Sequence, residues 1–223
     1  MKTIIQNFDP VEYDFVRLLQ TYIGAEDLTR LTTDYTDADD RSANSFYKSM
    51  EQSPHFRRMY AGLESDAGQA FYQLYERFVR EVIRPQYPGP IYFQARPSHR
   101  ILFADTPGES RFHRDGDYGH HAAEVNYQVA QTPVYGNNAM WIESQENLGD
   151  YAPVELAVGQ YARFRGVSLS HGARANDTGR SRVTFDFRVI PADLAPAAYV
   201  GAAHGADAAN PVQRNARNFR YCE

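Results

Sequence analysis

The chain has 223 residues, of which 43% are hydrophobic and 23% charged, so it is long enough for one domain with a substantial core and too apolar for a disordered protein. Its net charge is −5 and its basic residues form no run, which argues against a nucleic-acid-binding surface. The single cysteine, Cys222, excludes an intrachain disulfide, and no segment approaches the roughly 18 apolar residues of a membrane span or the pattern of a signal peptide. We therefore expect a cytoplasmic protein that binds neither nucleic acid nor a membrane.

Two helices are predicted in the first third of the chain. The first follows Pro10, which suits an initial helical turn, and ends at Gly24; its apolar positions recur at helical spacing, namely Val11, Phe15, Leu18, Leu19 and Tyr22. The second begins after Ser65 and stops at Pro85. Between them the polar, Asp-rich segment 34–44 predicts a loop. We expect residues 1–87 to be mostly helical.

From residue 88 onward, short apolar runs and alternating patterns separated by turn residues predict strands. The candidates are 91–93, 101–103, 125–129, 139–143, 154–156, 161–164 and 182–189. Helices followed by such a series predict a mainly β fold, a β-barrel or jelly roll with an N-terminal helical buttress.

We expect a single domain over residues 1–223, with the β-barrel core at 88–191 and a C-terminal tail at 192–223. The stretch 196–209 is rich in Ala and Gly and resembles a mobile connection. Three roles stay open for the end of the tail: packing back on the barrel, covering the active site, or forming the contact of a homodimer.

The segment His113-Arg114-Asp115, together with the distant His171, is the most specific chemical pattern in the sequence. Residues two apart on a strand point to the same face, so His113 and Asp115 could reach one ion, with His171 supplied by another strand. Two imidazoles and one carboxylate form the facial triad of non-haem iron sites, which leaves coordination positions open. A kinase catalytic loop also contains His-Arg-Asp, but it requires Asn where this chain has His120.

An alternating strand is predicted shortly after His171. Arg182, Thr184 and the polar residues that follow them share one face, and the residues between them are apolar. An Arg with a hydroxyl two residues further on can bind a carboxylate through charge-assisted hydrogen bonds. The strand therefore predicts a carboxylate receptor that faces the cavity.

At these residues the chain resembles the Fe(II)/2-oxoglutarate-dependent oxygenase superfamily, whose motif is His-x-Asp, a distal His and an Arg about one strand later. The segments FHRDGDYGH, NNAMWIES and LSHGARANDTGRSRVTFDFRVIP are similar to the small StrG-like oxygenases of aminoglycoside and other antibiotic biosynthetic clusters. The similarity extends over residues 97–191. It implies a double-stranded β-helix, that is, a jelly-roll or cupin-like barrel.

The resemblance also implies roles for individual residues. Fe(II) would be held by His113, Asp115 and His171, and the 5-carboxylate of 2-oxoglutarate by Arg182 with Thr184. Asn126 and Trp141 would lie near this co-substrate. Arg188 is a second candidate for the role of Arg182, at a longer spacing from His171 than is usual in the superfamily.

The implied reaction consumes O2 and 2-oxoglutarate, releases succinate, and hydroxylates, desaturates, cyclises or epimerises a small polar metabolite such as an amino acid or amino sugar. A carboxylate at position 115 disfavours halogenation, which needs a small residue there. Two alternatives stay open: a peptide or protein side-chain hydroxylase, and a non-oxidative cupin-type isomerase or metal-binding protein. Candidate contacts to the small-molecule substrate are Arg100, Asp117, Tyr118, His120, Glu143, Arg165, Arg174 and Arg188.

Overall fold

The computed structural model describes residues 2–35, 45–106, 110–200 and 218–223. Its helices are α1 (Phe15–Ile23), α2 (Ser45–Glu51), α3 (Pro54–Glu64), α4 (Gln69–Phe78) and α5 (Ala197–Val200), and a π-helical turn, Val79–Ile83, extends α4. The strands are β1 (Ile4–Asn7), β2 (Ile91–Gln94), β3 (Ser98–Leu102), β4 (Ser110–His113), β5 (Val125–Ala130), β6 (Met140–Ile142), β7 (Ala152–Val154), β8 (Gln160–Phe164), β9 (His171–Ala173), β10 (Arg182–Pro191) and β11 (Phe219–Cys222). No helix in these ranges is long and apolar enough to cross a membrane.

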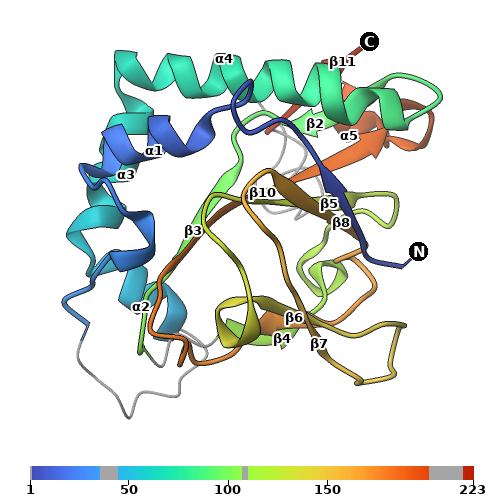
Figure 1. Ribbon diagram of the computed structural model, residues 1–223. Coiled ribbons are helices and arrows are strands. Elements are labelled where there is room, and N and C mark those ends of the chain that lie inside the picture. Colours follow the sequence, from blue (N-terminus) through green and yellow to red (C-terminus); the bar gives the residue numbers. More distant parts are fainter. Residues whose placement is uncertain (1, 36–44, 107–109, 201–217) are drawn as a thin grey trace.

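The strands form two antiparallel sheets (Figure 1). The larger sheet has the order β1-β8-β5-β10-β2-β11, with β3 also paired to β10, and the smaller has the order β4-β9-β6-β7. Apolar side chains of both sheets, among them Ala162 and Phe164 of β8 and Met140 and Ile142 of β6, belong to one buried cluster, so the sheets face each other. This is the predicted jelly roll, although the described strands leave both sheets open instead of closing a barrel.

The helices cover the outer face of the larger sheet, as Figure 1 shows for α1 and α4. Phe185 of β10 packs edge-on against Phe15 of α1 at 5.0 Å between ring centroids and against Phe71 of α4 at 5.6 Å. Two residues further on, Phe187 packs against Tyr75 at 5.3 Å. Because side chains alternate along a strand, this packing directs the intervening polar residues of β10 into the space between the sheets.

The first helix starts later than its apolar pattern predicts. The side chain of Asp14 accepts a hydrogen bond from the backbone N–H of Arg17 at 3.0 Å and so caps α1 at Phe15. Val11 lies outside the helix and is 85% exposed. The end at Gly24 is as predicted, since this residue adopts the left-handed conformation with φ of 72°.

Both edge strands of the larger sheet were missing from the sequence prediction. β1 pairs with β8, which places Ile4 opposite Arg163, and β11 pairs with β2, which places Phe219 opposite Gln94. The described end of the tail therefore packs back on the larger sheet, as one of the three predicted roles expected. The loop expected at 34–44 lies outside the described residues from 36 onward, as do 201–209 of the expected mobile connection.

His99 lies on β3 in the aromatic core beneath the helices. Its burial should make the free energy of unfolding decrease at acid pH. The side chain is 2% exposed and contacts the ring of Phe71 at 4.9 Å. Burial lowers the pKa of His99 to about 3, whereas an unfolded histidine titrates near pH 6.5. Between these values the unfolded chain binds the extra proton, so this group destabilises the fold as pH falls, by up to about 1.4 kcal/mol per pH unit.

We expect His99→Leu to flatten the loss of unfolding free energy between pH 6.5 and pH 4, measured by urea denaturation at several pH values. His121→Gln, which removes a histidine outside this core, is the matched control. If the unfolding free energy fell equally steeply from pH 6.5 to pH 4 in wild type and His99→Leu, His99 would not be the source of the acid sensitivity.

Candidate metal centre

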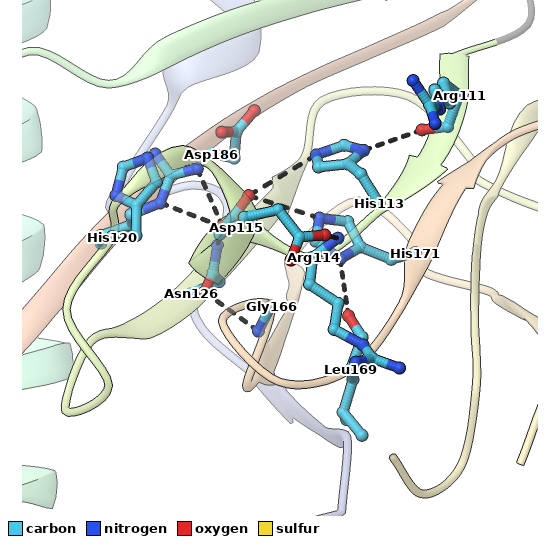
Figure 2. A network of polar contacts seen from close by, with 12 residues as sticks. Arg111, His113, Arg114, Asp115, His120, Asn126, Gly166, Leu169, His171 and Asp186 are labelled. Atoms are coloured by element: carbon cyan, nitrogen blue, oxygen red, sulfur yellow. Dashed lines mark hydrogen bonds and ion pairs between the residues drawn. The ribbon is translucent and has the colours of Figure 1, made fainter. Parts of the chain in front are cut away.

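The two histidines of the predicted triad lie on neighbouring strands of the smaller sheet. His113 at the end of β4 is paired directly with His171 at the start of β9, and their ring centroids are 4.7 Å apart. Asp115 follows in a short 3-10 turn, Asp115–Tyr118. Its Oδ1 lies 3.6 Å from Nε2 of His113 and 3.8 Å from Nε2 of His171, and the three potential ligand atoms lie within 4.8 Å of one another (Figure 2).

Backbone carbonyls orient both imidazoles. Nδ1 of His113 lies 2.8 Å from the carbonyl of Arg111, and Nδ1 of His171 lies 2.9 Å from the carbonyl of Leu169. A carbonyl can only accept, so Nδ1 carries the proton in each ring and the lone pair of Nε2 faces the shared space. This is the usual outer support of a metal-binding histidine.

The sequence predicted His113 and Asp115 on one strand, but Asp115 lies beyond the end of that strand. β4 ends at His113, and the backbone N–H of Asp115 donates to the carbonyl of Gly166 at 2.8 Å, which places its side chain beside the imidazoles. Burial would raise the pKa of Asp115. The positive charge of Arg188 and the hydrogen bond from Asn126 outweigh it and hold this pKa well below its usual range. The carboxylate is therefore available to a cation.

The donor set fits a divalent metal. Two imidazole nitrogens and one carboxylate oxygen converge from one side, and the cavity between the sheets opens on the other. The cavity has an empty volume of about 640 Å³, including space open to solvent. Its walls include the ligands and Tyr47, Arg100, Asn126, Gln128, Met140, Phe164, Arg182, Asp186 and Arg188.

Arg182 lies in the wall of this cavity, where its charge is buried with few hydrogen-bond partners. The residue is 3% exposed, and Nη1 donates to the carbonyl of Asn138 at 2.9 Å, while Nε has no partner among the described residues. Burial lowers the pKa of Arg182 to about 10, so it remains charged at neutral pH. The buried oxygens Oγ1 of Thr184 on β10 and Oε1 of Gln128 on β5 also lack partners among the residues that the structure describes.

Asn126 and Arg188 were assigned to co-substrate and substrate, and the structure places both against Asp115. Asn126 donates from Nδ2 to Oδ2 of Asp115 at 2.7 Å, and Arg188 donates to the same oxygen from Nη2 at 2.9 Å. Arg100, a candidate substrate contact, lines the cavity and pairs with Asp186 at 3.0 Å.

The other candidate contacts lie around the centre. Tyr118 is 54% exposed, with its ring 5.4 Å from that of His113. Asp117 accepts from the backbone N–H of Arg114 at 3.4 Å, and His120 bonds through Nδ1 to Glu124 at 2.8 Å.

The remaining candidates, like the three residues above, are not among those that line the cavity. Glu143 is 1% exposed and accepts from the backbone N–H groups of Ser170 at 2.7 Å and Gly149 at 3.2 Å. Arg165 donates to the carbonyl of Ala122. Arg174 stacks on Trp141 with its guanidinium 3.5 Å from the ring centroid.

Some cavity residues were not among the candidates. Gln128 lies two residues after Asn126 on β5 and shares its face, so the strand pattern alone could have identified it. Tyr47 carried no comparable signal, because α2 was not predicted. Glu124 and Tyr199, which contact each other behind Arg188, come from separate segments.

The fold is similar to that of a solved non-haem enzyme. A solved structure of the non-haem monooxygenase ThoJ with nickel has a TM-score of 0.50 and 15% identity, covering 85% of this chain and 74% of ThoJ. The 2-oxoglutarate-dependent epimerase SnoN of nogalamycin biosynthesis has a TM-score of 0.47 and 13% identity, covering 86% of this chain and 79% of SnoN. The likeness to ThoJ shows that the chain has the fold of this non-haem monooxygenase, and the described residues include a His-Asp-His cluster that could hold a metal.

A relative of known name shows the family to which the chain belongs. The streptomycin biosynthesis protein StrG of Streptomyces griseus is 31% identical over 184 residues, which cover 82% of this chain and 82% of StrG. The chain belongs to the StrG family, as its sequence segments predicted. No family model matches the sequence.

We expect His113→Gln to lower the affinity for Co(II) or Mn(II) by more than the roughly 10–100-fold typical of residues that only support a ligand. The protein should stay folded, because the side chain is 27% exposed and its other contact is local. Calorimetric titration of the metal measures the effect, with His55→Gln on α3 as the control. Equal affinities of His113→Gln and wild type would remove His113 from the ligand set.

Proposed function

We propose that this chain is an Fe(II)- and 2-oxoglutarate-dependent oxygenase that oxidises a small polar metabolite, an amino sugar or amino acid, in antibiotic biosynthesis. The observation that carries the proposal is the buried, incompletely paired Arg182 in the wall of the cavity that also contains the His-Asp-His cluster. A metal-binding isomerase or binding protein would not need a dedicated site for the carboxylate of a co-substrate.

The environment of Arg182 favours an anionic ligand. A guanidinium removed from water loses several kcal/mol of solvation unless a partner replaces it. The carbonyl of Asn138 is a neutral partner, and Nε remains unused. A carboxylate would supply the missing charge, and the hydroxyl of Thr184 could donate to it as well. The distal carboxylate of 2-oxoglutarate fits this receptor.

The chain's own residues would bind the metal and the co-substrate, orient them and keep water away from them. His113, Asp115 and His171 would hold Fe(II), and Arg182 with Thr184 would hold the co-substrate. When bound, iron and 2-oxoglutarate would supply the activation of O2, coupled to decarboxylation of 2-oxoglutarate to succinate and carbon dioxide. The apolar side chains of Met140 and Phe164 line the cavity and limit the access of water.

The substrate class is proposed from the cavity wall and from the relative. Arg100 and Asp186 form an ion pair in the wall, with side chains 26% and 17% exposed, so a hydroxyl, amine or carboxylate of a substrate would find both donors and acceptors. Tyr47 contributes a phenol beside Arg100. StrG takes its name from streptomycin biosynthesis, which supports a sugar-derived substrate.

Arg182→Met should abolish the binding of 2-oxoglutarate while metal affinity stays within a few-fold of wild type. Anaerobic titration of the Fe(II) protein with 2-oxoglutarate, followed through the visible charge-transfer absorption of the chelate, measures this. Arg96→Met, which removes an arginine that stacks on Tyr72, is the control. Absence of the absorption in wild type, with iron bound, would exclude the oxygenase proposal.

We expect amino sugars or amino acids to stimulate succinate release from 2-oxoglutarate in a substrate screen. Asp186→Asn should then raise KM for an amine-bearing substrate more than it lowers kcat, because the carboxylate would bind substrate without touching the reacting atom. Stimulation by peptides alone would instead favour a side-chain hydroxylase.

A further inference from the structure

One oxygen of Asp115 is surrounded by donors. Oδ2 accepts from Nδ2 of Asn126 at 2.7 Å (Figure 2 shows Asp115 beside Asn126) and from Nη2 and Nε of Arg188 at 2.9 and 3.2 Å. Three donors exceed the two in-plane lone pairs of a carboxylate oxygen, so Oδ2 has none left for a metal. Oδ1 faces the Nε2 atoms of His113 and His171. The two oxygens of one carboxylate are thus in different environments.

Arg188 is itself held in place by a second buried carboxylate, that of Glu124. Its Nε lies 3.7 Å from Oε2 of Glu124, a carboxylate with no exposed surface. Glu124 also accepts hydrogen bonds from Nδ1 of His120 at 2.8 Å and from the hydroxyl of Tyr199. Arg188 therefore lies between two buried carboxylates, and its guanidinium has little freedom to turn.

The arrangement differs from that of Arg182, the other arginine on the inward face of β10. Arg182 has a neutral backbone partner and an unused Nε, as expected of a residue that awaits an anion. Arg188 is already paired with the carboxylates of Asp115 and Glu124, and two of its nitrogens donate to Asp115, a potential metal ligand. Sequence spacing ranked Arg188 second to Arg182 as a ligand of the co-substrate carboxylate and gave it no role at Asp115.

We propose that Arg188 is a positioning residue, held by Glu124, that together with Asn126 fixes Asp115 as a single-oxygen metal ligand. A carboxylate free to rotate can bind a cation through both oxygens and so occupy a second coordination position. Occupying Oδ2 with donors keeps that position open for the reactants. The inference rests on the proposed metal centre and assigns no contact with 2-oxoglutarate to Arg188.

The test is Co(II) binding to full-length protein without 2-oxoglutarate, followed by calorimetry and by the visible d–d spectrum, which reports coordination geometry. Arg188→Met should lower metal affinity roughly 10–100-fold, the usual effect of losing an outer partner of a ligand, and should alter the spectrum. Arg188→Lys keeps the charge but cannot direct two N–H groups of one rigid fork at Oδ2, so its affinity should be intermediate. Arg84→Gln, which removes a half-buried arginine bonded to the carbonyl of Tyr87, should leave both readouts unchanged.

Removal of Arg188 leaves two buried carboxylates without their cation, which could unfold the chain. Arg188→Met combined with Glu124→Gln removes one charge of each sign, and far-UV circular dichroism checks its fold. The affinity loss should persist in this double variant. Wild-type affinity and spectrum in Arg188→Met or in the folded double variant, with or without weaker 2-oxoglutarate binding, would overturn the positioning role. If wild type itself binds no Co(II), the metal centre fails instead.

Discussion

The two faces of β10 constrain the rest of the structure. The strand is ten residues long and lies in the middle of the larger sheet, with neighbours on both edges. Its apolar side chains pack beneath the helices, while Arg182 and Arg188 project into the space between the sheets. A shift of register by one residue would exchange the faces and bury charge in the aromatic core. Packing against α1 and α4 thus fixes the orientation of the residues that surround the cavity.

The second constraint is the cost of burying charge. Asp115, Glu124 and Arg188 are all withdrawn from water, and each has a partner of opposite charge at short range. Arg182 has no such partner among the described residues, although it is only 3% exposed. The comparison separates charges that the fold satisfies by itself from one that remains for a ligand. Removing one member of a satisfied pair is costly, because it leaves the other charge buried and alone.

The sequence predicted what depends on local spacing and alternation. The strand after His171, its polar and apolar faces, the metal-ligand candidates and the jelly-roll class could all be read from short segments. It could not predict β1 or β11, because each is a short edge strand whose partner lies far along the chain. It ranked Arg182 ahead of Arg188 by spacing, but it could not place Arg188 against Asp115, since that placement depends on Glu124 and Asn126, which only the folded sheet brings close.

The pairing of His113 with His171 has a consequence for stability. The strands of the smaller sheet have only three or four residues each, so few backbone hydrogen bonds hold it together. A metal bound to both histidines would act as a cross-link between β4 and β9, and to the turn that carries Asp115. Ligands that bind only the folded state add their binding free energy to its stability. Metal loading would then also serve as a structural clamp that closes one side of the jelly roll.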